Sequence, residues 1–119
     1  MEAKFKFEKL TIWQFAMDFG EEIHELSKDF PKNEVYNLQS QIRRAGDSIA
    51  LNISEGAMLQ STKEFQKFLG YSIRSLAEVV TCLHKGNRRK YFTEGDFQKY
   101  YGKAFSLMNM MIAFKKTLK

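Results

Sequence analysis

Seven apolar residues near the C-terminus recur with strict spacings of three and four positions. They are Phe97, Tyr100, Ala104, Leu107, Met111, Phe114 and Leu118. Such spacings place side chains on one face of an α-helix, and their strict alternation is typical of helical bundles and coiled coils. This seam predicts a chain that buries helices against one another rather than building a sheet.

The same helical period recurs in three earlier segments. We expect α-helices over about residues 11–30, 33–56, 61–89 and 93–118. Pro31 ends the first helix because it lacks an amide proton, and Gly56 ends the second. Short connections between long helices favour antiparallel neighbours. The sequence therefore predicts an all-α fold, an antiparallel up-down-up-down four-helix bundle, as one domain over residues 1–119.

Two helix starts have the spacing of a capping box, in which a hydroxyl residue at the N-cap is followed three residues later by Glu or Gln. Thr11 precedes Gln14 in this way, and Ser61 precedes Glu64. We therefore expect Thr11 and Ser61 to cap the first and third helices.

Charge balance and cysteine content limit the class of protein. Nineteen Lys and Arg against fourteen Asp and Glu give a net charge of +5, which permits a polyanionic partner without requiring one. The single cysteine, Cys82, cannot form an internal disulfide, and this argues for a reducing compartment. The charged start MEAKFKFEKL does not resemble a signal peptide, and no apolar stretch is long enough to cross a bilayer. We expect a cytoplasmic protein.

Basic side chains gather on the face of the expected third helix that lies opposite its apolar seam. This basic stripe consists of Lys63, Lys67, Arg74, Lys85 and Arg88, and it continues through Arg89 and Lys90. Its members are candidates for contact with a nucleic-acid backbone. A solvated face is the simpler interpretation, since a face opposite a core must be polar. Tyr71 and Tyr91 are the only aromatic residues nearby that can stack on bases.

Two other surface features concern assembly. The outward face of the first helix is acidic and carries Asp18, Glu21, Glu22, Glu25 and Asp29. The fourth helix has an apolar stripe beside its seam, formed by Tyr101, Phe105, Met108 and Ile112. This apolar stripe is either part of a broad core or an interface between subunits, where methionines are common. A closed homo-oligomer would follow from the second interpretation.

Patterns that support catalysis or metal binding are weak. Glu21 and His24 form a single Glu-x-x-His motif, whereas a di-iron bundle needs the motif on two helices and two further glutamates. Cys82 and His84, two residues apart on a helix, point in different directions. The sequence contains no Gly-rich phosphate loop, nucleophile elbow or Cys-x-x-Cys motif. We expect no catalytic residues, no metal, no cofactor and no enzyme activity.

A row of polar residues follows the apolar seam of the second helix, where burial disfavours polar groups. This polar ladder consists of Gln41, Arg44, Ser48, Asn52 and Glu55. Ser75 and Glu78 on the third helix are candidate partners, and Glu78 completes the ladder through an expected ion pair with Arg44. Pairing across helices would satisfy the buried amide of Asn52 and fix the register of the bundle. A ligand-binding row is the functional alternative.

The run QIRRAGDSIALNISEG, residues 41–56, together with LTIWQFAMDF, FPKNEVYNLQSQ and SIRSLAEVVTCL, resembles the four-helix bundle proteins of the 23S ribosomal RNA intervening-sequence family. The likeness extends from about Leu10 to Leu118. Its most specific positions are Arg44, Ala45, Ser48, Ile49, Asn52, Ile53, Glu55 and Gly56.

This resemblance implies a function without defining one. Members are encoded within, or related to proteins encoded within, insertions in large-subunit ribosomal RNA genes, and their biochemical role is largely undefined. The fold is also similar to accessory proteins of diversity-generating retroelements, which form basic five-membered rings that bind nucleic acid and a reverse transcriptase. We therefore expect a non-enzymatic homo-oligomer, a pentamer by this resemblance, that associates with ribosomal or other structured RNA or with a nucleic-acid enzyme. A scaffolding homo-oligomer without nucleic-acid contact is the alternative.

Three positions depart from expectation. Lys90 occupies a turn position where the family commonly has glycine, so either it adopts a left-handed backbone or the turn has another shape. Gly86 and Gly102 lie inside expected helices, where each costs up to about 1 kcal/mol relative to alanine. Close approach of a neighbouring helix would explain these two glycines.

Overall fold

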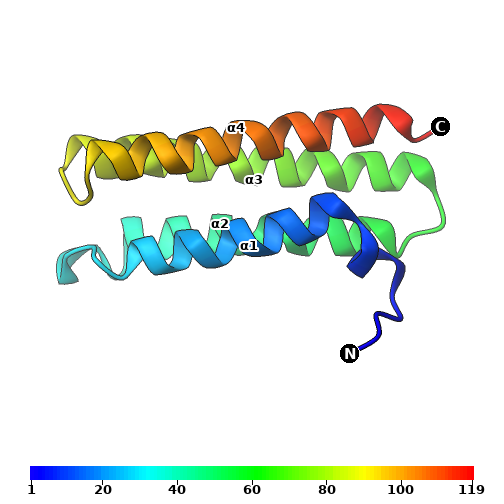
Figure 1. Ribbon diagram of the computed structural model, residues 1–119, viewed down its shortest axis with the longest axis horizontal. Coiled ribbons are helices and arrows are strands. Elements are labelled where there is room, and N and C mark those ends of the chain that lie inside the picture. The colour runs from blue at the N-terminus through cyan, green and yellow to red at the C-terminus, as the bar shows by residue number, and fades with distance from the viewer.

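The computed structural model describes residues 1–119 and contains four long α-helices. The elements in chain order are the 3-10 helix η1 (Lys6–Lys9), α1 (Thr11–Ser27), the 3-10 helix η2 (Lys32–Glu34), α2 (Leu38–Ala57), α3 (Thr62–Arg88) and α4 (Glu94–Thr117). Consecutive long helices run in opposite directions, and the α1–α2 pair lies alongside the α3–α4 pair (Figure 1). The predicted all-α four-helix bundle is confirmed. None of its helices combines the length and apolar character needed to span a membrane.

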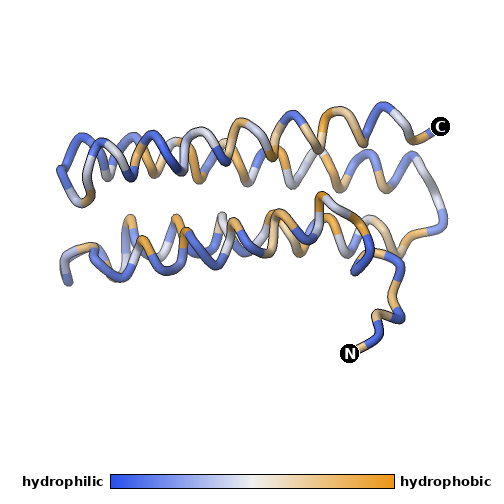
Figure 2. The backbone as a smooth tube through the Cα atoms, viewed as in Figure 1, coloured by the Kyte–Doolittle hydropathy of each residue, from blue (hydrophilic) through white to orange (hydrophobic).

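The four helices enclose one continuous core of 21 buried apolar side chains. Hydrophobic and hydrophilic residues alternate along every helix with the period of the helical turn (Figure 2). In α4, Phe97, Leu107 and Met111 are buried, as the three-four seam predicts. Burying a large apolar side chain contributes roughly 1.5–3 kcal/mol, so this seam holds α4 on the bundle.

α1 and α2 pack at short range through two glycines. A Cβ atom added to Gly20 would lie 3.2 Å from the carbonyl oxygen of Gly46. The absence of side chains at these two positions therefore allows the two backbones to approach closely.

The junction between α1 and α2 differs from the prediction. α1 ends at Ser27 rather than near residue 30, and α2 begins at Leu38 rather than near residue 33. The carbonyl of Ser27 accepts hydrogen bonds from the backbone N–H of Phe30 at 3.1 Å and from Gln39 Nε2 at 2.8 Å, so this group at the helix end is satisfied by the connection and by α2. Pro31 then adopts an extended backbone, and Glu34 turns its side chain inward.

The caps also differ in part from the prediction. Ser61 accepts a hydrogen bond from the backbone N–H of Glu64 at 3.2 Å, as expected for the N-cap of α3. At α1 the N-cap is Leu10, and Thr11 already lies inside the helix. Gln14 donates its side-chain hydrogen bond to the carbonyl of Glu8 at 2.8 Å, because the short helix η1 presents that group nearby.

The turn after α3 is a Schellman motif with Lys90 in the left-handed conformation, φ 63°. The backbone N–H of Tyr91 donates to the carbonyl of Gly86 at 3.0 Å, and that of Lys90 donates to the carbonyl of Asn87 at 3.1 Å. Gly86 lies against the ring of Phe92, which a Cβ atom there would approach to 2.5 Å. A side chain in the adjoining turn, rather than a neighbouring helix, thus explains Gly86.

Gly102 has no such neighbour. A Cβ atom at this position would meet nothing within 4 Å, so the expectation of close helix approach is wrong for Gly102. The residue is exposed on α4 and its backbone is helical. We find no structural requirement for glycine there.

Candidate nucleic-acid interface

The basic stripe is exposed along α3 and the turn that follows it. The seven members are Lys63, Lys67, Arg74, Lys85, Arg88, Arg89 and Lys90. α3 has 27 residues and is therefore about 40 Å long at 1.5 Å per residue. Only Arg89 forms an ion pair, with Glu34 at 2.8 Å, and the other two ion pairs of the molecule involve none of the stripe. Six positive charges are thus left without an acidic partner.

Two aromatic residues near the stripe have structural roles. The guanidinium of Arg74 lies 5.1 Å from the ring centre of Tyr71, which packs against Phe68. This cation–π contact positions Arg74 without occupying its N–H donors. Tyr91 is unavailable for stacking, because its hydroxyl donates to Glu34 and its ring packs on Phe30.

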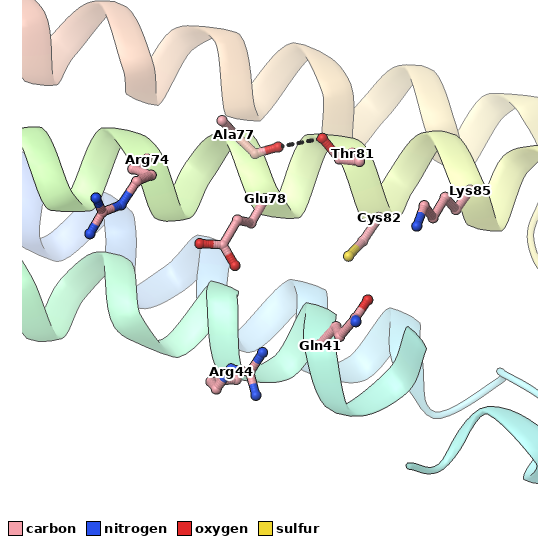
Figure 3. Close-up of a pocket in the computed structure, with 8 residues that line it drawn as sticks. All are labelled: Gln41, Arg44, Arg74, Ala77, Glu78, Thr81, Cys82 and Lys85. Atoms are coloured by element: carbon pink, nitrogen blue, oxygen red, sulfur yellow. Dashed lines mark hydrogen bonds between the residues drawn. The ribbon is translucent and has the colours of Figure 1, made fainter. Parts of the chain in front are cut away.

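An open groove of about 340 Å³ lies between α2 and α3 (Figure 3). Its lining consists of Gln41, Arg44, Arg74, Ala77, Glu78, Thr81, Cys82 and Lys85. The side chains of Arg74, Glu78 and Cys82 extend from α3 toward α2 (Figure 3). The α2–α3 groove therefore joins one end of the polar ladder to the middle of the basic stripe, which the sequence suggested as separate features.

The expected Arg44–Glu78 ion pair does not form. Neither residue takes part in any of the three ion pairs, although both line the groove. Both side chains are exposed, and water competes effectively for charges at such positions. The groove consequently presents three unpaired cations and one unpaired carboxylate.

The thiol at the base of the groove carries no charge at neutral pH. Burial raises the pKa of Cys82, because a thiolate is poorly solvated among apolar neighbours. His84 points to another face of α3, where its ring lies 5.0 Å from that of Phe97. Cys82 and His84 therefore do not form a nucleophile–base pair.

The rest of the polar ladder serves helix packing more than the surface. Ser48 Oγ donates to Ser75 Oγ at 2.6 Å across the α2–α3 contact. Asn52 was expected to bond across as well, but its Nδ2 donates to the carbonyl of Ser48 in its own helix at 2.8 Å. The side chains of Gln41 and Glu55 are exposed. The ladder is thus divided into a packed centre and exposed ends.

A buried carboxylate at one end of the bundle was not foreseen as a functional or structural site. Glu34 is 5% exposed, and its Oε2 accepts hydrogen bonds from Tyr91 Oη at 2.5 Å and Arg89 Nη1 at 2.8 Å. Its Oε1 accepts from Asn37 Nδ2 at 2.9 Å. Hydrogen bonding, chiefly from Tyr91, holds the pKa of Glu34 below its usual value of 4.5 and outweighs the opposing effect of burial. Glu34 therefore fixes the orientation of Arg89 at the end of the basic stripe.

The acidic and apolar stripes are also on the surface. On α1, Glu22 pairs with Lys103 of α4 and Glu25 pairs with Lys28, whereas Asp18 and Glu21 stay exposed, as does Asp29 in the turn after the helix. On α4 the side chains of Phe105, Tyr101 and Ile112 are 56%, 41% and 36% exposed, and Met108 is half-buried. No group of three His, Cys, Asp or Glu side chains is arranged to hold a metal ion.

The family model of the 23S rRNA-intervening sequence proteins matches residues 8–113. The chain belongs to this family. The match covers all of the basic stripe and the polar ladder, so both features lie within the 23S rRNA-intervening sequence domain. Among curated proteins no match to the chain was found.

A solved structure has the same fold as this 23S rRNA-intervening sequence protein. It is the crystal structure of a protein of unknown function from the S23 ribosomal protein family of Bacteroides thetaiotaomicron. The two structures superpose with a TM-score of 0.82 at 22% sequence identity, over 89% of this chain and 99% of that chain. At this level of identity the likeness establishes the fold and carries no residue roles.

The family pattern in residues 41–56 serves two purposes in the structure. Ala45, Ile49 and Ile53 are buried in the core, and these positions maintain the bundle. Arg44 faces the α2–α3 groove instead. The most specific run of this 23S rRNA-intervening sequence protein therefore includes a residue that the core does not require.

Proposed function

We propose that this protein is a non-enzymatic, homo-oligomeric module of the cytoplasm that binds structured RNA through the basic stripe of α3. The observation that supports the proposal is the set of six stripe cations without acidic partners. The description of the family, which refers to an intervening sequence of 23S rRNA, gives the class of nucleic acid. Ribosomal RNA segments are therefore the first ligands to test.

The energetics favour a backbone contact rather than base recognition. Lysine and arginine side chains that neutralise phosphates release condensed counterions, and this release provides sequence-independent affinity. We infer no aromatic platform for unpaired bases in the stripe, because Tyr91 is bonded to Glu34 and the ring of Tyr71 contacts the guanidinium of Arg74. We therefore expect recognition of RNA shape and charge, with weak dependence on sequence.

The apolar stripe of α4 supports self-association. Phe105 and Tyr101 are large apolar side chains left exposed in a single subunit. Exposed apolar surface of this kind is typical of subunit interfaces. Five subunits follow from the resemblance to ring-forming accessory proteins, and a ring would repeat the basic stripe once in each subunit.

Charge reversal on the stripe tests RNA binding. We expect the triple variant Lys67→Glu, Arg74→Glu, Arg88→Glu to lose binding to a labelled stem-loop transcribed from 23S rRNA, measured by fluorescence anisotropy. A control variant with the same change in net charge is Lys4→Glu, Lys6→Glu, Lys9→Glu, near the N-terminus, which should retain most of the affinity. Circular dichroism confirms that both variants fold.

The same experiment addresses the scaffolding alternative. In that case the exposed acids of α1, such as Glu21, would meet the basic stripe of the next subunit, and the triple reversal would dissociate the oligomer. Native mass spectrometry reports this outcome directly. Undiminished RNA binding by the α3 variant, or loss of assembly without any RNA binding by the unaltered protein, would contradict the proposed function.

A further inference from the structure

The α2–α3 groove has an alternating arrangement of charge along α3. Arg74 precedes Glu78 by four residues and Lys85 follows it by seven, so the backbone positions of these two cationic residues lie about 6 Å and about 10 Å from that of Glu78 along the helix axis. Arg44 borders the same groove from α2 (Figure 3). The groove thus presents a cation, an acceptor and a cation in sequence.

We infer that this groove binds a short segment of one RNA strand, with phosphates at Arg74, Arg44 and Lys85 and a ribose 2′-hydroxyl donating to Glu78. The inference rests on the proposed function and specifies how the stripe distinguishes RNA from DNA. A strand of RNA alternates negatively charged phosphates with hydroxyl donors, and the groove alternates the complementary groups.

Glu78 restricts which class of ligand can bind in the groove. A carboxylate only accepts hydrogen bonds and repels phosphate, so it weakens the binding of a ligand that offers anionic oxygens alone. A chain that passes Glu78 must present a donor there. Between consecutive phosphates RNA has the 2′-hydroxyl, and DNA has no donor on the sugar.

The other lining groups leave this arrangement free for a ligand. Thr81 Oγ1 already donates to the carbonyl of Ala77 at 2.9 Å, and Cys82 stays neutral. Arg74 is held by the ring of Tyr71 with its donors unused, which reduces the entropy lost when it binds a phosphate. The groove volume of about 340 Å³ is at the lower end of the range for small-ligand sites.

The test compares an RNA stem-loop with the DNA oligonucleotide of the same sequence, using the unaltered protein and Glu78→Ala. We expect Glu78→Ala to weaken RNA binding about three- to tenfold, as for the loss of one hydrogen bond, while DNA binding is unchanged or tighter. The substitution removes an exposed side chain without hydrogen-bond partners, so the fold is retained. Glu55→Ala, on the exposed flank of α2, is the matched control and should affect RNA and DNA equally.

The direction of the change in RNA affinity in Glu78→Ala shows whether Glu78 accepts a hydrogen bond from the RNA or only repels its phosphates. If Glu78 were only a solvated acid in a basic surface, its removal would tighten the binding of RNA and DNA alike, and the inference would be overturned. A base amino group is the second possible donor to Glu78, and the DNA oligonucleotide of the same sequence carries the same amino groups. Equal losses of RNA and DNA affinity in Glu78→Ala would therefore assign the contact to a base and overturn the inference. Failure of the unaltered protein to bind any RNA would refute the proposed function as well as this inference.

Discussion

The hydroxyl of Tyr91 donates a hydrogen bond of 2.5 Å to Oε2 of Glu34, 57 residues earlier in the chain. The contact links the α1–α2 connection to the turn between α3 and α4. The left-handed residue Lys90 lies between Arg89 and Tyr91, and both of these neighbours reach the same carboxylate oxygen. One buried carboxylate thus joins the two connections at this end of the bundle.

The ionised form of Glu34 should stabilise the fold above acidic pH. Its pKa in the folded protein is lowered, so its contribution is present above the usual value of 4.5 and is lost as the pH falls through the lower folded value. We expect Glu34→Gln to reduce the free energy of unfolding at pH 7 by on the order of 1–3 kcal/mol, because a hydrogen-bonded carboxylate is replaced. Urea unfolding from pH 7 to pH 3 should show a flatter acid dependence for the variant. An unchanged acid dependence would contradict this role.

Glycine substitutions should have opposite effects at two helical positions. Gly102→Ala is expected to raise the free energy of unfolding by up to about 1 kcal/mol, since alanine is a better helix former than glycine and its Cβ meets no neighbour. Gly86→Ala is expected to lower it by about 1–3 kcal/mol, because the Phe92 ring must move away. Thermal unfolding of the two variants measures both effects, and a shift in the same direction for both would disagree with the packing described.

Lys90→Gly should stabilise the α3–α4 turn. A left-handed backbone costs a residue with a Cβ about 1–2 kcal/mol, and glycine avoids this cost while losing part of the gain through the entropy of the unfolded chain. We expect a net increase of about 0.5–1 kcal/mol in the free energy of unfolding. Lys90→Ala removes the same charge but keeps the Cβ, and it should not stabilise the protein. Equal effects of the two substitutions would show that charge, rather than backbone strain, determines stability there.

Phe105→Asp should dissociate the proposed homo-oligomer without unfolding the subunit. Phe105 is 56% exposed in one subunit, so the fold does not depend on its burial, whereas a charge at an apolar interface opposes association. Light scattering after size exclusion should show a smaller species. Tyr36→Asp, at a position 97% exposed on the α1–α2 connection, is the control and should leave the mass unchanged. If the mass of Phe105→Asp is unchanged, the subunit interface does not include Phe105.

The helices could be predicted from sequence because helical period is a local property. Phe97, Leu107 and Met111 are buried as their spacing indicates, and the cap of α3 at Ser61 needed only its near neighbours. Cap assignment failed at Thr11 because the helix starts one residue earlier than expected: Leu10, directly after η1, has the extended backbone of the N-cap, which periodicity does not reveal.

Contacts between residues far apart in the sequence could not be predicted from local sequence patterns. The two partners of Glu34 Oε2 lie 55 and 57 residues away, and a single acid after Pro31 resembles a surface residue. Its only signal was its place in the FPKNEVYNLQSQ junction that matches the family pattern. The α2–α3 groove was missed for a related reason: a helical wheel orients Arg44 and Arg74 on their own helices but does not give the rotation of one helix against another.

The salt dependence of RNA binding tests the central proposal most directly. Each phosphate contact contributes about 0.7–0.9 to the slope of log affinity against log salt concentration. Replacing Lys67, Arg74 and Arg88 with alanine should therefore reduce the magnitude of that slope by about 2–3 for the 23S rRNA stem-loop, whereas alanine at Lys4, Lys6 and Lys9 should reduce it far less. Equal slopes for the unaltered protein and the α3 variant would show that the basic stripe does not contact the RNA backbone.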